Sequence, residues 1–430
     1  MNYDEALAFL AGLTRFGVNL GLGRIEELLE RLGNPHLALK VLHVGGTNGK
    51  GSTVAMLSSI LKAAGYRAGA FTSPHLHSYT ERFQINGAEI TRERLAELIG
   101  EIRPHLESMV MEGYEHPTEF EVGTALAFLY FFRERVDFLV MEVGLGGEID
   151  STNVARSIIS VITNVAMDHM DYLGNSVWEI ARVKAGIIKP GVPVVTAAAG
   201  EGLEVIERVC REKHSPLTVV GRDVSWEEIS VSTSGQRFLF KGFEGTYDIE
   251  LPLLGRHQQV NAAAAAAAAE ILMRKGVAVS REHVRQGLAG TRWPGRLEIM
   301  CREPLVVIDG AHNPHAAGSL SRALEDFFPG RKVVLVIGML EDKERAKVVG
   351  ELAPLARAVV VTRPDSPRAG NWRELASMAG RHVNEVYQIE NVRQAVDSAL
   401  SLAGPADLVC VTGSLYMIAE AREVLLSRFC

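Results

Sequence analysis

Apolar stretches of strand length alternate with amphipathic stretches of helical length along most of the 430-residue chain. In the first part of the chain, helical patterns cover Thr53–Ala64 and Gly123–Arg133. Continuous apolar runs around them predict strands over Val41–Val44, Arg67–Phe71, Phe138–Val143, Ile158–Thr163 and Val192–Thr196. Because the strands are apolar on both faces and alternate with helices, the pattern predicts a parallel sheet covered by helices on both sides.

Residues 217–254 follow a different pattern. Their β-branched and aromatic runs are broken by Ser-Gly and Glu-Gly turns, which is typical of a small antiparallel patch, here attached to the first domain. An uninterrupted alanine run, Ala262–Ala269, then predicts a helix that begins after Asn261.

The segment Thr291–Glu298 (TRWPGRLE) carries Pro and Gly between two regular regions and predicts a domain junction. After it the alternation restarts, with strands expected over Leu305–Ile308, Val333–Ile337, Ala358–Thr362, Glu385–Ile389 and Leu408–Val411. At roughly 150 residues per domain, the length also favours more than one domain. We therefore expect a large first domain over residues 1–294 and a smaller doubly wound domain over residues 295–430.

Composition narrows the class of protein. Hydrophobic residues make up 47% and charged residues 23%, with a net charge of −7, which argues against disorder and against a nucleic-acid partner. The scattered cysteines have no zinc spacing and are expected to be reduced thiols: Cys210, Cys301, Cys410 and Cys430. The N-terminus does not resemble a secretory signal, and the alanine run is too short to span a bilayer. We expect a cytoplasmic protein without a membrane partner.

The segment HVGGTNGKGST, residues 43–53, follows a predicted strand and opens a predicted helix. Gly49 and Gly51 allow backbone N–H groups to approach phosphate oxygens, and the helix N-terminus adds positive potential. Lys50 is placed to reach the β- and γ-phosphates, and Ser52 and Thr53 offer hydroxyls to phosphate or Mg²⁺. The match to G-x-x-x-x-G-K-[ST] is imperfect, because Gly51 lies between Lys50 and Ser52. A glycine-rich turn with a solvated lysine is the alternative, but the strand before it and the helix after it favour phosphate binding.

Polar residues follow three of the predicted parallel strands. Ser73 follows one strand, Glu142 ends the apolar run VDFLVMEVG, and Asp168 and His169 follow another. Ligands of open parallel sheets bind at the carboxyl ends of the strands, and a carboxylate with a hydroxyl suits Mg²⁺. Histidine suits Mn²⁺ better. The alternatives are a surface carboxylate that caps a strand and a hydrogen-bonded loop histidine.

Several segments together resemble the folylpolyglutamate synthase and dihydrofolate synthase family of the Mur-ligase superfamily. One short motif is weak evidence, whereas a series of motifs in the family's order along nearly the whole chain is specific. The segments are GTNGKGS (46–52), TSPHLHSYTERFQING (72–87), EVGLGGEIDSTN (142–153), TNVAMDHMDYLG (163–174), ARVKAGIIK (181–189), WPGRLE (293–298) and DGAHNP (309–314).

The resemblance implies an α/β fold, with an N-terminal parallel-sheet P-loop ATPase domain that carries the antiparallel patch, and a smaller C-terminal Rossmann-like glutamate ligase domain. It implies an ATP-dependent amide ligase acting on folate or dihydropteroate. In the family, ATP phosphorylates a substrate carboxylate, and the amino group of L-glutamate attacks the acyl phosphate. Phosphorylation makes chemical sense because a carboxylate otherwise has no good leaving group.

The resemblance also assigns roles by position. Lys50, Lys184 and His312 are the implied catalytic residues, and Lys184 matches a lysine that the family carries as a carbamate. One or two Mg²⁺ ions are implied, with Ser73, Glu142 and His169 as ligands. The implied nucleotide-binding residues are Asn48, Gly49, Lys50, Gly51, Ser52, Asn261, Arg296 and Asp309.

For the substrates, the resemblance implies a pteroate pocket lined by Thr118, Phe120, Asp150 and Ser151. Ser414 matches a serine near the glutamate site. Core packing is the alternative for Phe120, and a helix N-cap is the alternative for Ser414. The stretch of residues 73–87 resembles the family's mobile loop.

One position departs from the family pattern. Many bacterial members with dihydrofolate synthase activity read GGRLDATN where this chain reads GGEIDSTN, so Glu148 replaces an arginine. The reversed charge puts the dihydropteroate step in question, although not the ligase assignment. The alternatives are a Mur-type ligase of a peptidoglycan precursor, a P-loop switch ATPase, and a non-catalytic relative. Family analogy suggests a monomer.

Overall fold

The computed structural model describes residues 1–17, 19 and 21–429, so Cys430 lies outside the described residues. Cys210, Cys301 and Cys410 form no disulfide within this part of the chain. The chain forms two compact units. Unit 1 comprises Met1–Glu228, Phe238–Glu250 and Val260–Thr291, and unit 2 comprises Ile229–Arg237, Leu251–Gln259 and Arg292–Cys430. The domain boundaries 1–294 and 295–430 stay a prediction.

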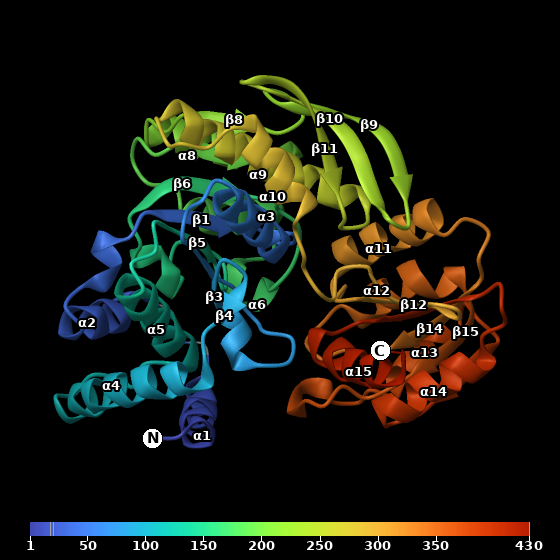
Figure 1. Ribbon diagram of the computed structural model, residues 1–430. Helices are drawn as coiled ribbons and strands as arrows, with labels where there is room; N and C mark the ends of the chain where they lie inside the picture. The colour runs from blue at the N-terminus through green and yellow to red at the C-terminus, as the bar shows by residue number, and fades with distance from the viewer. Residues whose placement is uncertain (18, 20, 430) are drawn as a thin grey trace. The chain divides into compact units, whose positions relative to one another are not determined.

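The large sheet of unit 1 has the strand order β4-β3-β2-β5-β1-β6-β7-β8 (Figure 1). Its strands are β1 (Val41–Gly45), β2 (Ala68–Phe71), β3 (Phe83–Ile85), β4 (Ala88–Glu89), β5 (Phe138–Glu142), β6 (Ser157–Ile162), β7 (Val194–Thr196) and β8 (Leu217–Val219). From β2 to β8 all neighbours run parallel, and β3 and β4 add an antiparallel edge. The start of the predicted antiparallel patch was wrong, because residues 217–219 pair with β7 as the last parallel strand.

Helices cover the large sheet. The helices in this part of the chain are α1 (Tyr3–Leu13), α2 (Gly23–Arg31), α3 (Lys50–Ala63), α4 (Arg92–Met111), α5 (Glu119–Arg133), α6 (Met170–Leu173), α7 (Val177–Ala185), α8 (Gly200–Glu212), α9 (Arg256–Arg274) and α10 (Arg281–Ala289). Residues of α1, α2, α4 and α5 share one hydrophobic cluster with Phe71, Leu139 and Met141 of the sheet. Helix α3 contacts β1, β2 and β5 and packs against α10. Burial of apolar strand residues on both sides explains their continuous apolar runs.

Helix α9 carries the alanine run. Ala262–Ala269 are all buried, with exposures between 0% and 1%, and their small side chains allow close packing. The prediction that this helix begins after Asn261 was wrong, because it begins at Arg256. Gly255, at φ +97°, immediately precedes Arg256, and its carbonyl accepts the N–H of Gln258.

A three-stranded sheet has the order β11-β10-β9, with β9 (Ser225–Ser232), β10 (Gly235–Gly242) and β11 (Gly245–Leu251). Only residues 233–234 and 243–244 connect consecutive strands. Such short turns join antiparallel neighbours, as the Ser-Gly and Glu-Gly turns predict.

The sheet of unit 2 has the order β12-β13-β17-β14-β15-β16 (Figure 1). Its strands are β12 (Glu298–Arg302), β13 (Leu305–Asp309), β14 (Val333–Ile337), β15 (Ala356–Val361), β16 (Glu385–Gln388) and β17 (Leu408–Thr412). All pairs are parallel except β12 with β13. The helices are α11 (Pro314–Phe327), α12 (Arg345–Leu352), α13 (Glu374–Ala379), α14 (Val392–Leu402) and α15 (Leu415–Phe429). The predicted doubly wound architecture is confirmed.

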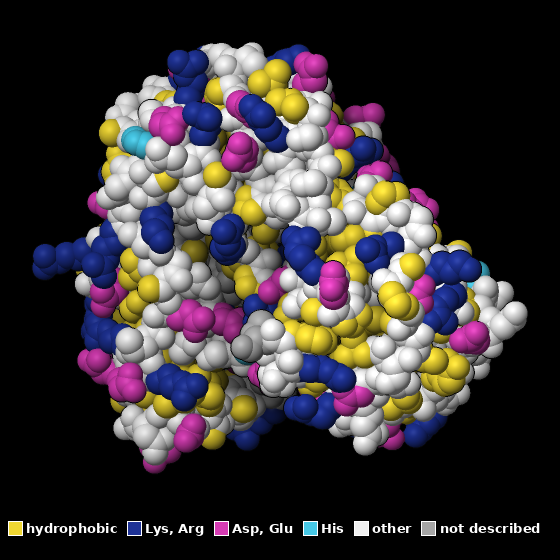
Figure 2. Space-filling view, turned by 45° about the vertical axis from the view of Figure 1, so that its right-hand side comes forward, with side chains coloured by type: hydrophobic (Ala, Val, Ile, Leu, Met, Phe, Trp, Pro, Cys, Tyr) yellow, Lys and Arg dark blue, Asp and Glu magenta, His cyan; other side chains and the backbone are white. Residues whose placement is uncertain are grey.

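The surface carries charges of both signs. On the face shown in Figure 2, lysine and arginine side chains are dispersed among acidic and uncharged ones and do not gather into one basic patch. Among the described residues, no helix combines the length and apolar character that crossing a bilayer requires.

Candidate active site

The loop between β1 and α3 has a backbone that requires glycine. Gly46 lies at φ +135° and Gly49 at φ +84°. A Cβ atom on Gly46 would lie 2.0 Å from Thr163 Oγ1, and one on Gly49 would lie 2.5 Å from Asn261 Oδ1. The packing therefore excludes a side chain at either position and brings Asn261 against the loop. Because α3 begins at Lys50, its positive end faces the same loop.

Hydroxyl and amide groups hold this loop in shape. Thr53 Oγ1 donates to the carbonyl of Gly49 at 3.0 Å, so the helix backbone uses that hydroxyl. The N–H of Asn48 donates to Asn164 Oδ1 at 2.9 Å, and its carbonyl accepts from Thr163 Oγ1 at 2.7 Å. The sequence did not predict that Thr163 and Asn164 support this loop, although both belong to the segment TNVAMDHMDYLG. Ser52 remains the hydroxyl candidate of the motif and is 2% exposed.

Two lysines converge on this loop. Lys50 Nζ donates to the carbonyls of Gly46 and Thr47 at 3.1 and 3.0 Å. Lys184 Nζ, from α7, donates to the same Gly46 oxygen at 3.0 Å. Burial, together with the charge of Lys50, lowers the pKa of Lys184 to about 7, while Asp168 and Asp150 oppose the shift. A substantial share of Lys184 is consequently a neutral amine near pH 7.

The predicted metal ligands are partly brought together. Glu142 ends β5 and is 5% exposed, and its Oε2 accepts the N–H of Ser73 at 3.2 Å. His169 precedes α6 with φ 51°, and its Nε2 lies 3.9 Å from Asp168 Oδ1. The described residues contain no group of three or more His, Cys, Asp or Glu side chains arranged to hold a metal. A buried carboxylate beside a serine suits a hard cation whose remaining ligands are phosphate and water oxygens.

A cavity of about 270 Å³ lies within unit 1. Four residues that the family resemblance implies for the pteroate pocket line it, namely Thr118, Phe120, Asp150 and Ser151. Ser73 lines the cavity as well, so the cavity adjoins the residue next to Glu142. Residues from distant parts of the chain thus form one pocket beside the candidate metal site.

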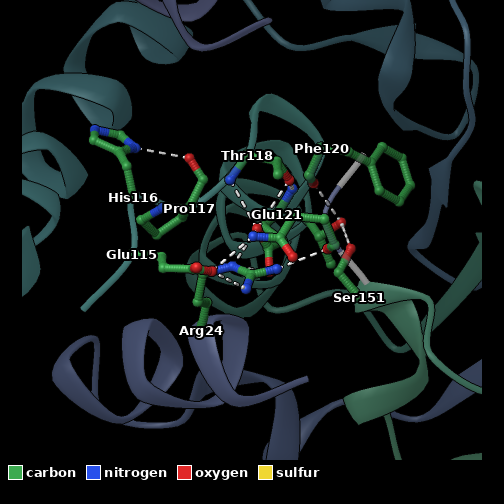
Figure 3. A network of polar contacts seen from close by, with 10 residues as sticks. Arg24, Glu115, His116, Pro117, Thr118, Phe120, Glu121 and Ser151 are labelled. Atoms are coloured by element: carbon green, nitrogen blue, oxygen red, sulfur yellow. Dashed lines mark hydrogen bonds and ion pairs between the residues drawn. The ribbon is translucent and has the colours of Figure 1, made fainter. Parts of the chain in front are cut away.

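Thr118 is fixed by a polar network at the start of α5 (Figure 3). Its N–H and its hydroxyl donate to Glu121 Oε2 at 2.7 and 2.9 Å, and the Glu121 N–H returns a bond to Thr118 Oγ1. Arg24 pairs with Glu121 and with Glu115, each at 3.1 Å. His116 bonds the carbonyl of Pro117 nearby, at 2.8 Å. Arg24 and Glu121 were missed because the ion pair joins residues far apart in the sequence.

The other cavity residues are also held in place. A Cβ atom on Gly144 would lie 2.3 Å from Phe120 Cζ, so this glycine makes room for the aromatic ring. Thr124 Oγ1 bonds Ser151 Oγ at 2.8 Å. Asp150 accepts the N–H groups of Leu145 and Thr152 at 2.7 and 3.0 Å. Burial raises the pKa of the Asp150 carboxyl, while these hydrogen bonds oppose the shift.

Arg82 is a further cation at this cavity. Its Nη1 lies 3.0 Å from Glu119 Oε1, and its Nε donates to His75 Nδ1 at 3.0 Å. The guanidinium also lies over the Tyr79 ring, 4.4 Å from the centroid. Arg82 and Glu119 both line the cavity. The sequence did not predict them as site residues, because their position at the cavity becomes apparent only in the folded structure.

The predicted site residues of unit 2 gather at the carboxyl ends of β13 and β17. Asp309 accepts the N–H groups of Leu297 and Ala311, each at 2.8 Å. Burial raises the pKa of the Asp309 carboxyl, and the charge of Arg296 opposes the shift. His312 Nδ1 bonds the Gly310 carbonyl at 2.9 Å.

Ser414 follows β17 and is 2% exposed. Among the described residues, its Oγ has no hydrogen-bond partner. The alternative that a helix N-cap hydrogen bond explains this serine is therefore wrong. A buried hydroxyl without a protein partner suits a ligand.

Glu148 lies apart from the cavity. Its side chain is exposed, its N–H donates to the Val183 carbonyl at 2.9 Å, and the described lining residues include Ile149 and not Glu148. The changed charge at this position therefore does not line the cavity.

Known protein families and proteins match the sequence of this chain over nearly its whole length. The Mur ligase middle domain matches residues 44–269, and the glutamate ligase domain of Mur ligases matches residues 295–415. The dihydrofolate synthase/folylpolyglutamate synthase of Bacillus subtilis is 39% identical, over 98% of this chain and 99% of that protein.

Solved structures of folate enzymes superpose on this chain. Mycobacterium tuberculosis folylpolyglutamate synthase, complexed with ADP and AMPPCP, superposes with a TM-score of 0.92 at 34% identity, covering 99% of each chain. Escherichia coli FolC in complex with DHPP and ADP superposes with a TM-score of 0.89 at 33% identity, covering 100% of this chain and 99% of that one. The chain therefore belongs to the folylpolyglutamate synthase/dihydrofolate synthase family of the Mur-ligase superfamily.

Proposed function

We propose that this protein joins L-glutamate to folates in an ATP-dependent reaction that forms an amide bond. The observation that carries the proposal is the convergence of Lys50 and Lys184 on the Gly46 carbonyl, in the same unit as the cavity lined by Phe120 and Asp150. The relatives named above are folate enzymes by name, so the Mur-type peptidoglycan ligase and the switch ATPase are not favoured.

The reaction requires an activated carboxylate. The γ-phosphoryl group of ATP transfers to a carboxylate oxygen of the folate, which releases ADP. The neutral amino nitrogen of glutamate then attacks the acyl carbon, phosphate leaves, and the nitrogen loses a proton to give the amide. The N–H groups of Gly49 to Ser52 and the ammonium of Lys50 hold the phosphates and stabilise charge on the transferring group. Asn261, which packs against Gly49, is placed to contact the nucleotide.

Ser73 and Glu142, with His169, are the proposed ligands of Mg²⁺. The buried Glu142 carboxylate and the adjacent Ser73 fit a magnesium ion that completes its shell with water and ATP oxygens. When bound, the ion neutralises phosphate charge during transfer. His169 suits this role less well, because its side chain is 39% exposed and lies beside Asp168.

Lys184 is the proposed carbamate. A neutral lysine amine adds to CO₂, and a proton leaves, so that a cation is replaced by an anion that can hold a second metal ion. The lowered pKa of Lys184, about 7, supplies the required neutral amine. The mass of the intact protein in bicarbonate and in CO₂-free buffer tests this assignment.

The residues of unit 2 are the proposed partners of nucleotide and glutamate. Arg296 and Asp309 are assigned to the nucleotide, His312 to nucleotide and incoming glutamate, and Ser414 to glutamate. The buried Ser414 hydroxyl supports this assignment, since a ligand would supply its missing hydrogen bond. We further propose a cytoplasmic monomer.

Dihydropteroate is the proposed second acceptor. The exposed position of Glu148, outside the cavity lining, supports it, because the changed charge does not contact the pocket.

The decisive experiment follows ADP release with Mg-ATP and L-glutamate, with tetrahydrofolate in one tube and dihydropteroate in another. Glutamate-dependent turnover with both establishes a bifunctional enzyme. Turnover with tetrahydrofolate alone restricts the protein to polyglutamylation, and Glu148→Arg then tests whether this position sets the restriction. ADP release that is independent of folate and glutamate contradicts the proposal.

A further inference from the structure

A buried chain of hydrogen bonds connects β1 to the cavity. His43, in the middle of β1, has its Nε2 2.8 Å from Thr152 Oγ1. The Thr152 hydroxyl donates in turn to Asp150 Oδ1. Asp150 lines the cavity, and the exposures of His43, Thr152 and Asp150 are 0%, 0% and 5%. The chain therefore leads from a strand of the core, through two fully buried side chains, to a wall of the cavity.

The direction of each hydrogen bond follows from the groups around Asp150. Both carboxylate oxygens accept backbone N–H groups, from Leu145 and Thr152, so the carboxylate acts as an acceptor. The single hydroxyl proton of Thr152 goes to Asp150, which leaves only lone pairs of Oγ1 for His43. His43 Nε2 must then carry the proton and donate it to Thr152.

The surroundings of the other ring nitrogen, Nδ1, support the tautomer with the proton on Nε2. Among the described residues, His43 Nδ1 has no hydrogen-bond partner. With the proton on Nε2, Nδ1 is a bare acceptor. The opposite tautomer would bury an N–H donor without an acceptor, and such orphaned donors are rare. Burial also lowers the pKa of His43 to about 3, with Lys189 adding to the shift, so the ring is a neutral donor at working pH.

The chain holds two functional segments together. Asp150 and Ser151 line the cavity, and Asp150 caps the short 3-10 helix Ser151–Val154 that contains Thr152. His43 belongs to β1, which ends at Gly45 and continues into the glycine-rich loop of Lys50. A side chain in a cavity wall holds a ligand in a defined geometry when its own orientation is fixed, and a fixed donor behind the Asp150 carboxylate supplies that constraint.

We propose that His43 is a positioning residue for folate binding: through the Thr152 hydroxyl it fixes the Asp150 carboxylate in the wall of the cavity against which the pteridine ring of the folate binds. This inference rests on the proposed function, because it takes the ligand of the cavity to be a folate. It assigns His43 no contact with substrate and no proton transfer. It also predicts that the effect of His43 passes entirely through Thr152.

The test uses three variants of the full-length protein. His43→Leu removes the donor, Thr152→Val removes the hydroxyl with little change of shape, and His43→Gln keeps an N–H donor near the position of Nε2. KM for tetrahydrofolate and for ATP are measured, together with the Kd of the folate for the nucleotide-free protein. We expect His43→Leu and Thr152→Val each to raise the KM and Kd for folate about tenfold, as loss of one aligned hydrogen bond implies.

Further readouts separate positioning from a purely structural role. KM for ATP should stay within about twofold of wild type, and His43→Gln should restore most of the folate affinity. The double variant His43→Leu/Thr152→Val should be no weaker than either single variant, because both break the same chain. Nitrogen-15 NMR of the ring should report protonated Nε2 and unprotonated Nδ1.

His36 provides the matched control. It is also a buried histidine of unit 1 whose Nδ1 has no partner among the described residues, and it packs against Phe128 with 5.7 Å between ring centroids. His36→Leu should change thermal stability without changing the KM for folate.

Two results overturn the inference. One is a folate KM in His43→Leu and Thr152→Val equal to that of wild type, with stability altered as in His36→Leu. The other is a ring protonated at Nδ1 and not at Nε2. Failure of the proposed function is distinct from both, because wild-type protein would then show no folate-dependent turnover and no folate binding.

Discussion

The side-chain amines of Lys50 and Lys184 donate to one carbonyl oxygen, that of Gly46, at 3.1 and 3.0 Å. Two ammonium groups this close repel each other, and the repulsion is strong where water is scarce. Lys184 is the buried member of the pair, at 4% exposure, and its pKa is lowered to about 7. Burial therefore makes Lys184 an amine that readily becomes neutral.

Lys50→Ala should reduce kcat by at least about a hundredfold, because a preorganised charge at the transferring phosphoryl group is lost. Stability should change little, since Lys50 bonds only loop carbonyls and is not fully buried. ADP release and thermal melting measure the two effects. Lys62→Ala, at an exposed position near the end of the same helix, is the control. Wild-type turnover in Lys50→Ala would contradict the phosphate-loop assignment.

Lys184→Met should stabilise the protein below about pH 7 by an amount on the order of a few kcal/mol. The folded-state pKa is about 7 and the unfolded value is 10.5, so between these pH values the unfolded chain binds the additional proton. Wild-type stability therefore rises with pH across this window, and the advantage of the methionine variant shrinks toward pH 10.

Urea denaturation in CO₂-free buffer at pH 6 and pH 9.5 measures this difference. Lys62→Met, at an exposed position, should show a much smaller dependence on pH. If the free energy of unfolding of Lys184→Met differed from that of wild type by the same amount at both pH values, burial of the Lys184 amine would not be what destabilises the wild-type protein.

Gly144→Ala should raise the KM for folate while leaving the KM for ATP unchanged. The added Cβ atom would lie 2.3 Å from Phe120 Cζ, so the ring must shift within the cavity it lines. Steady-state kinetics with each substrate varied in turn tests this. Gly100→Ala is the control, since nothing lies within 4 Å of its Cβ position in α4, and it should stabilise the protein by about 1 kcal/mol.

Ser414→Ala should raise the KM for glutamate without loss of stability. The Ser414 Oγ has no partner among the described residues, so its removal costs no protein hydrogen bond and relieves a buried polar atom. The melting temperature and the glutamate KM are the measurements. Ser401→Ala, which removes an exposed bond to the Asp397 carbonyl, should leave the glutamate KM unchanged. An unaltered glutamate KM in Ser414→Ala would contradict the glutamate-site assignment.

The buried parallel strands could be predicted because apolar runs such as Val333–Ile337 occupy the whole strand. The short strands β3 and β4 could not, because their residues are partly exposed and few. Sequence motifs predicted Lys50 and Asp150 at the site. They could not predict Arg24 beside Glu121, because that ion pair joins residues 97 positions apart and depends on how α2 and α5 pack.

The division of the chain between the two units limits how this protein can be cut. Unit 2 takes in residues 229–237 and 251–259 from the middle of the chain as well as everything after residue 291. A single proteolytic cleavage, or a gene divided at one point, therefore cannot separate the two units, because a cut after residue 291 leaves two segments of unit 2 in the fragment that holds unit 1. An exchange of the C-terminal unit between relatives would have to transfer three separate segments together, so the two units are expected to be inherited as one piece.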